Sequence, residues 1–176
     1  MKFKDVLNEL DLKKNKWTSV SFSSLDNETK QRLWEMYQKT YAKIGLHIES
    51  KEKLTSKYKV SWLIDIDKDP QIDAFIIYKD SPKAKKISLL GSDGRKESKA
   101  KLIKKMISLL KKKGWVIGAS HKVAEIIKSN GVPVITNPDI IKSIDDKFID
   151  MEPDGEYRRS LAGIGIIKKY MFGKIK

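Results

Sequence analysis

The chain has 176 residues, the size of one globular domain, and 40% of them are apolar. It carries 37 Lys and Arg against 23 Asp and Glu, a formal net charge of +14, with two histidines and no cysteine. The lack of cysteine excludes disulfides, thiolate nucleophiles and zinc-ribbon sites, and two histidines argue against a histidine-rich site, so no metal is expected.

The sequence predicts one soluble, cytoplasmic domain over residues 1–176. No apolar run approaches the roughly 20 residues that cross a bilayer, so no membrane partner is expected, and the start Met1–Asp5 is unlike a signal peptide. Residues 1–16 are expected to form an N-terminal arm or helix. Residues 157–176 are expected to form a basic and apolar C-terminal extension.

The first predicted elements are a strand and a helix. Residues 17–22 alternate and are rich in β formers, which indicates a strand. Ser24 or Asp26 then caps a helix that ends at Gly45. Its apolar residues fall at helical spacing: Leu33, Trp34, Tyr37, Tyr41 and Ile44.

Strands dominate the middle of the chain. Residues 58–67 and 72–78 are predicted to pair as an antiparallel hairpin through the turn Asp69–Pro70. The later elements are strands at 87–90, 115–119, 132–135 and 148–151, helices at 98–113 and 121–129, and a turn at Asn137–Pro138. This order favours an α+β (mixed α/β) fold, with a central, mostly antiparallel twisted sheet flanked by helices.

The positive charge is concentrated in one segment. Residues 81–113 hold 12 Lys and Arg against two acidic residues, around the turn Gly91–Lys99. A strand, a glycine turn and a helix N-terminus together form a site for phosphate, because unpaired N–H groups and the helix dipole favour an anion there. The alternative interpretation is that Gly91–Gly94 is simply a tight turn.

At this turn the chain resembles the GNAT superfamily of acyl-coenzyme A-dependent N-acyltransferases, and divergent bacteriophage GNAT-like proteins most of all. The order of elements matches over residues 17–151. In that family the fourth strand feeds a pyrophosphate loop with the pattern Gln/Arg-x-x-Gly-x-Gly/Ala. Here Gly94 can serve as the turn glycine, but Glu97 or Ser98 fills the later Gly/Ala position.

The resemblance implies acetyl-CoA, or a related acyl-CoA, as cosubstrate. Its pyrophosphate would lie on N–H groups of the turn, its 3′-phosphate against Arg95, Lys96 and Lys99, and its pantetheine along residues 87–90. The implied binding residues are Ser88, Leu89, Leu90, Gly91, Ser92, Asp93, Gly94, Arg95, Lys96, Glu97, Ser98 and Lys99.

The family's catalytic pattern is only partly present. Its proton donor is a tyrosine on the helix that corresponds to residues 121–129, where this chain has none, so Ser120 or His121 is the candidate donor to the leaving thiolate. Asp65, Asp67 and Asp73 are the candidate bases. The alternatives are a solvated hairpin tip for Asp65 and Asp67, and an ordinary helix N-terminal residue for His121.

We therefore expect an N-acetyltransferase that acts by direct transfer in a ternary complex, with a protein amine, a small amine or a nucleic-acid base as acceptor. The alternative is a GNAT-shaped basic binding module without catalysis, bound to DNA or to a virion. The expected partners are the acyl donor, nucleic acid at segments 81–113 and 157–176, and a further copy of the chain. Alternatively, the apolar residues of 157–176 pack on the core or on another subunit.

Overall fold

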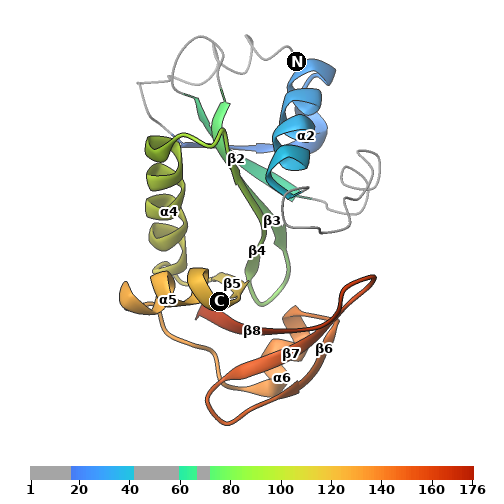
Figure 1. Ribbon diagram of the computed structural model, residues 1–176, viewed down its shortest axis with the longest axis vertical. Coiled ribbons are helices and arrows are strands. Elements are labelled where there is room, and N and C mark those ends of the chain that lie inside the picture. Colours follow the sequence, from blue (N-terminus) through green and yellow to red (C-terminus); the bar gives the residue numbers. More distant parts are fainter. Residues whose placement is uncertain (1–16, 42–59, 67–71) are drawn as a thin grey trace. The chain divides into compact units, whose positions relative to one another are not determined.

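The computed structural model describes residues 17–41, 60–66 and 72–176 (Figure 1). The predicted N-terminal arm, the end of the first helix at Gly45, Asp67 and the turn Asp69–Pro70 lie outside these residues. The chain forms two compact units, residues 1–79 with 89–104, and residues 80–88 with 105–176. One strand, β4 (Lys85–Ser92), and one helix, α4 (Lys96–Leu110), pass through both units.

The first unit contains most of the N-terminal elements. Besides parts of β4 and α4, they are β1 (Trp17–Ser21), a short 3₁₀ helix (Phe22–Ser24), α2 (Asn27–Tyr41), β2 (Val60–Ile66) and β3 (Ile72–Asp80). The strand order is β1-β2-β3-β4, with β2 antiparallel to β1 and to β3. Of the two predicted caps of α2, Asp26 is used: its Oδ1 accepts from the N–H of Thr29 at 2.7 Å.

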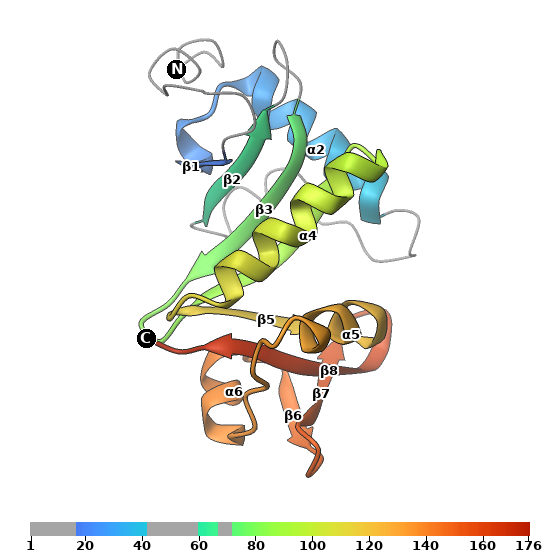
Figure 2. The same ribbon diagram turned by 90° about the vertical axis from the view of Figure 1, so that its left-hand side faces the viewer.

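The core of the first unit is built around β3. Every residue from Ile72 to Tyr78 is buried, as expected for a strand covered on both faces. Helix α2 buries Leu33 and Tyr37, and Figures 1 and 2 show it lying along the strands of this unit. Asp73 is the one charged residue in the buried run of β3.

The second unit holds the later elements. With the start of β4 and the end of α4, they are β5 (Trp115–Ala119), α5 (His121–Ser129), α6 (Pro138–Ile144), β6 (Phe148–Met151), β7 (Glu156–Leu161) and β8 (Gly165–Lys174). The strand order is β4-β5-β8-β7-β6. Only β4 and β5 are parallel; the other neighbours in this unit are antiparallel. The mixed, mostly antiparallel sheet is therefore confirmed.

One face of this second sheet is covered by α6. Ile141 of α6 packs with Val116, Tyr157 and Met171, which come from three different strands. Helix α6 forms because Asn137 caps it, with its side-chain oxygen accepting from the N–H groups of Asp139 and Ile140, and because Pro138 stands at the first helical position.

Three predictions along the chain were wrong. The helix predicted at 98–113 begins at Lys96 and ends at Leu110. Residues 132–135 form no strand but a single bridge from Val134 to Phe172, and Asn137–Pro138 begins a helix where a simple turn was predicted. Residues 157–176 are no extension: they make up most of β7 and β8, and β8 lies between β5 and β7 with Met171 and Phe172 buried. The alternative, that this segment packs on the core, is the one observed.

Candidate functional site

The glycine turn of the first unit joins β4 to α4 as the sequence predicts. A Cβ atom on Gly91 would overlap the ring of Phe75, so only glycine lets the strand pass this close to β3. Gly94 has φ +95, which favours glycine, and nothing lies within 4 Å of where its Cβ would be. The turn is therefore tight against the core at Gly91 and open at Gly94.

The turn satisfies much of its own backbone. The N–H of Gly94 donates to Ser92 Oγ at 3.3 Å, and the N–H of Arg95 donates to Asp93 Oδ1 at 2.9 Å. The first intrahelical bond of α4 runs from Lys99 N to Arg95 O at 3.0 Å. The N–H groups of residues 96–98 precede that bond, so they are the donors that the helix offers to an anion.

Asp93 acts as the cap of α4. Partial burial would raise the pKa of its carboxyl, but hydrogen bonds from the N–H and side chain of Arg95, together with the guanidinium charge, outweigh burial and lower it. Asp93 thus stays ionised at the helix N-terminus. This cap also explains why α4 begins two residues before the predicted start.

Arg95 ties the turn to the core. Its guanidinium lies 2.6 Å from Asp73 Oδ1 and 2.6 Å from Asp93 Oδ2. Lys101 Nζ lies 3.7 Å from the other oxygen of Asp73, whose side chain is 1% exposed. Two of the sequence-predicted site residues, a candidate base and a candidate phosphate ligand, are therefore paired with each other.

A contact that the sequence did not predict holds the strand beside the turn. Tyr41 Oη, from the end of α2, donates to the carbonyl of Leu90 at 3.0 Å and accepts from its N–H at 2.9 Å. Burial raises the pKa of Tyr41 to about 12, against the lowering effect of this backbone bond. The helical spacing assigned Tyr41 to the apolar face, and nothing in the sequence marked its hydroxyl.

The remaining binding candidates surround the turn. Lys96, Glu97 and Lys99 are exposed in the first turn of α4, whereas Ser98 is buried. On β4, Ser88 and Leu89 are half-buried, and the Ser88 hydroxyl donates weakly to Lys86 O at 3.4 Å.

The other catalytic candidates lie apart from the turn in the sequence. The backbone of Asp65 pairs within β2 opposite Trp17 and Ala74; Asp67 lies outside the described residues. Ser120 and His121, in the second unit, are exposed at the start of α5, where Ser120 makes no side-chain cap bond. His121 has φ +29, in the left-handed region that a non-glycine residue rarely adopts, and such strain is common at functional sites.

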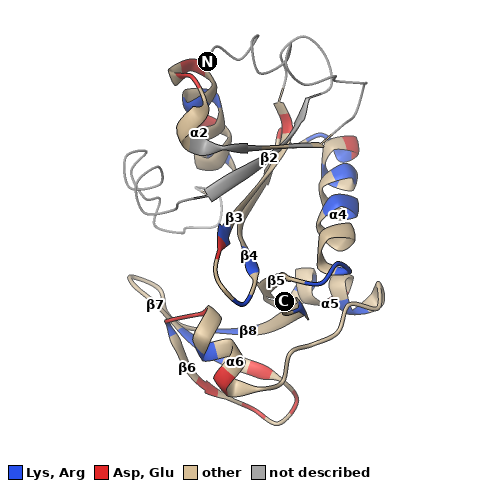
Figure 3. Ribbon diagram, turned by 180° about the vertical axis from the view of Figure 1, so that it is seen from behind, with Lys and Arg blue, Asp and Glu red and all other residues tan. Residues whose placement is uncertain are grey.

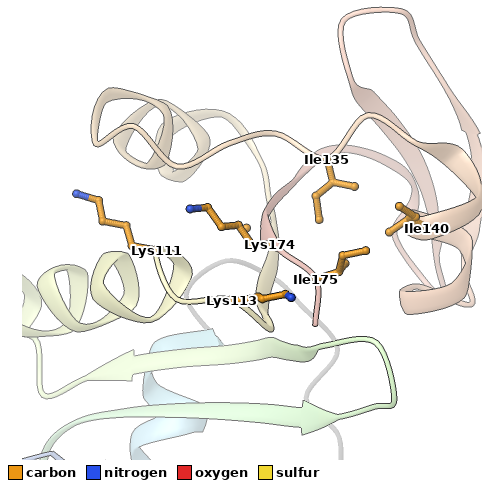
Figure 4. Close-up of a pocket in the computed structure, with 7 residues that line it drawn as sticks. Lys111, Lys113, Ile135, Ile140, Lys174 and Ile175 are labelled. Atoms are coloured by element: carbon orange, nitrogen blue, oxygen red, sulfur yellow. The ribbon is translucent and has the colours of Figure 1, made fainter.

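The second unit also has an open pocket of about 630 Å³. Figure 4 shows Lys111 and Lys174 on one side of it, and Ile135, Ile140 and Ile175 on the other. Lys111 comes from basic segment 81–113 and Lys174 from basic segment 157–176, and Gly114 N donates to Lys174 O at 2.7 Å where the two segments meet. Figure 3 shows the cations along α4 and the acidic residues around α6 and β6.

Two searches of the structure itself were negative. Within residues 17–41, 60–66 and 72–176, no group of His, Asp and Glu side chains is arranged to hold a metal ion. Among the helices of the described part of the chain, none is long and apolar enough to span a membrane.

The fold has a counterpart among solved proteins. No protein-family model matches the chain, and no curated protein matches its sequence. The crystal structure of the ribosomal-protein-S18-alanine N-acetyltransferase from Escherichia coli is similar over 91% of this chain and 94% of that one, with a TM-score of 0.52 and 12% sequence identity. At this identity the likeness shows the fold: the chain has the GNAT fold, as its element order predicted.

Proposed function

We propose that the chain is an acyl-CoA-dependent N-acyltransferase that uses acetyl-CoA. The observation that carries this proposal is the strand–turn–helix of β4 and α4 within a GNAT fold. The N–H groups of residues 96–98 precede the first intrahelical bond, and the side chains of Lys96 and Lys99 are exposed beside them. Backbone donors, helix dipole and side-chain cations thus converge on one place where a pyrophosphate can bind.

The residues present fit this cosubstrate at the turn. The space around Gly94 is open, so phosphate oxygens can approach the backbone there. Lys96 and Lys99 are its expected cation partners, whereas Arg95 serves the turn through Asp73 and Asp93. Acetyl-CoA supplies an acyl group activated as a thioester.

Along β4 the fit involves one exchange. The strand pairs with β5 at Lys85, Lys86 and Ile87, and farther along it the N–H and carbonyl of Leu90 are held by Tyr41. A ligand that pairs with Leu90 in the manner of a strand has to displace this hydroxyl. Tyr41 therefore competes with the cosubstrate for one residue of β4.

The chain's own groups assign the proton transfers. Because there is no cysteine to carry the acyl group, direct transfer to the amine is the consistent route. Ser120 or His121 donates a proton to the departing sulfur. Asp65 or Asp67 accepts the proton of the amine, since the carboxylate of Asp73 is engaged by Arg95 and Lys101.

The test is calorimetric titration of acetyl-CoA into the wild type and two glycine variants. Gly94→Glu places bulk and negative charge at the turn, and Gly131→Glu is its matched control, since Gly131 also has positive φ and nothing within 4 Å of its Cβ position. We expect binding to be lost in Gly94→Glu and kept in Gly131→Glu. A wild type that does not bind millimolar acetyl-CoA contradicts the proposal.

A second candidate function is a basic module that binds an anionic polymer such as DNA. The observation that favours it is the meeting of both basic segments at the pocket lined by Lys111, Lys113 and Lys174. Such binding is expected to tolerate any sequence and to weaken steeply with salt, with a slope of about −0.9 per neutralised phosphate on duplex DNA.

This candidate is tested by titrating duplex DNA at two salt concentrations. Changing Lys111, Lys113 and Lys174 to Gln should flatten the salt slope by about three contacts. The control changes three exposed lysines elsewhere, Lys104, Lys122 and Lys142, to Gln. Equal effects of the two triple variants would show that the pocket has no special part in binding.

A further inference from the structure

The second unit buries a cluster of charges around Asp145, the residue that ends α6. Its side chain is fully buried. Lys86 Nζ and Tyr157 Oη each lie 3.2 Å from Asp145 Oδ2, and Arg159 Nε lies 3.2 Å from Oδ1. The N–H of Lys147 also donates to Oδ1, at 3.2 Å. One carboxylate is thus shared by two cations and a phenol.

A third cation lies on the same face. Lys169 of β8 is opposite Tyr157 of β7 in the antiparallel ladder, so their side chains project from the same side of the sheet. It also neighbours β5: a Cβ on Gly118 would lie 3.6 Å from Lys169 Cδ and 2.5 Å from Tyr157 Oη. Within the described part of the chain, the Lys169 ammonium has no hydrogen bond and no carboxylate within 4 Å.

The cluster has more positive charge than its own carboxylate can balance. Lys86, Arg159 and Lys169 face Asp145 alone, which leaves two uncompensated charges when Lys169 is protonated. Burial lowers the pKa of Lys169 to about 8, with the charges of Arg159 and Lys86 acting in the same direction and Asp145 against them. Burying unpaired charge is costly, and an incoming anion would remove that cost.

Solvent can reach this cluster. The side chain of Lys86 is 16% exposed and that of Arg159 is 20% exposed, and Lys169 is half-buried. The cations come from three strands, β4, β7 and β8, whose register fixes their spacing. The arrangement is therefore partly preorganised for a compact ligand rather than a patch of freely moving surface lysines.

We propose that Lys86, Arg159 and Lys169 bind the phosphate-monoester dianion of a small amine. Two negative charges on the ligand match the two uncompensated charges of the cluster, whereas a carboxylate or a phosphodiester brings only one. The guanidinium of Arg159 adds directional hydrogen bonds to phosphate oxygens. That this amine is the acyl acceptor rests on the proposed acyltransferase function; the anion site itself does not.

The test is calorimetric titration of inorganic phosphate near neutral pH into the full chain. The key variant is Lys169→Met, and Lys168→Met is the matched control because Lys168 is the adjacent residue on the other face of β8, with a side chain 61% exposed and paired to Glu156. Loss of one charge-assisted contact should weaken phosphate binding about tenfold or more in Lys169→Met. Lys168→Met should bind like the wild type.

Two further arms remove competing explanations. Phosphate binding should persist in Gly94→Glu, which separates this site from the glycine turn, so that either proposal can fail alone. Acetate and dimethyl phosphate, both monoanions, should bind about tenfold or more weakly than phosphate. The proposal is overturned if phosphate does not bind, if Gly94→Glu abolishes binding, if both lysine variants behave alike, or if the monoanions bind as tightly as phosphate.

Discussion

Replacing Lys169 by Met should make the protein more stable at neutral pH. The physical reason is the position of Lys169, half-buried among β5, β7 and β8 beside Arg159 and Lys86, where its ammonium lacks a carboxylate partner. Methionine is similar in length, flexible and uncharged, so it fills the same space without the charge.

The magnitude follows from the protonation equilibrium. The pKa of Lys169 falls from its usual 10.5 to about 8 in the folded protein. That difference corresponds to about 3 kcal/mol of unfavourable interaction of the protonated form. Because the side chain keeps some contact with water, we expect Lys169→Met to gain about 1–3 kcal/mol.

The pH dependence gives the sign an independent check. Between the two pKa values the unfolded chain holds a proton that the folded chain has released, so the wild type becomes more stable as the pH rises from 8 towards 10.5. Below 8 both forms are protonated and the folded state bears the full cost. The advantage of Lys169→Met should therefore be greatest near neutral pH and should shrink above about pH 10.

Urea unfolding across this pH range measures the effect. Lys168→Met, at an exposed position, should change the free energy of unfolding by about 0.5 kcal/mol or less at every pH. The reasoning is refuted if Lys169→Met is no more stable than Lys168→Met near neutral pH, or if its advantage does not depend on pH. A stabilised variant that has also lost phosphate binding would show stability sacrificed for a binding site.

Three further variants test the interactions on which the two units depend. Asp145→Asn should cost about 3–5 kcal/mol of unfolding free energy in urea titrations, because it leaves the cations Lys86 and Arg159 without their carboxylate; a loss under 1 kcal/mol would contradict the described cluster. Asp73→Asn should cost about 2–4 kcal/mol by the same assay, and the exposed Asp139→Asn serves as its control. Tyr41→Phe should tighten acetyl-CoA binding, measured by calorimetry, because Leu90 loses its internal partner; weaker binding would mean that Tyr41 supports the site.

Local sequence signals identified the elements whose boundaries are set locally. Asp26 marked the start of α2, and the apolar spacing of residues 102–110 marked the buried face of α4. The turn between β4 and α4 was found because glycine is required there, by the ring of Phe75 at Gly91 and by positive φ at Gly94. The α+β class followed from the order of these elements.

Signals that depend on distant partners were not readable. Residues 157–176 looked like a basic tail because Arg158–Arg159 and Lys168–Lys169 put cations in adjacent positions. In a strand, adjacent residues face opposite sides, so one member of each pair is exposed and the other reaches the buried cluster. Only the pairing of β7 with β8 shows which member is which.

The candidate site was limited in the same way. Arg95 and Asp73 are 22 positions apart in the sequence, and their pairing turns an apparent phosphate ligand and an apparent base into a brace for the turn. This pairing narrows the cation partners of a bound pyrophosphate to Lys96 and Lys99, which remain exposed in the first turn of α4. If the proposal is correct, replacing either lysine should weaken acetyl-CoA binding without loss of stability, whereas replacing Arg95 should weaken binding only by loosening the turn. Comparing the binding and unfolding free energies of Lys96→Met and Arg95→Met separates the ligand from the brace.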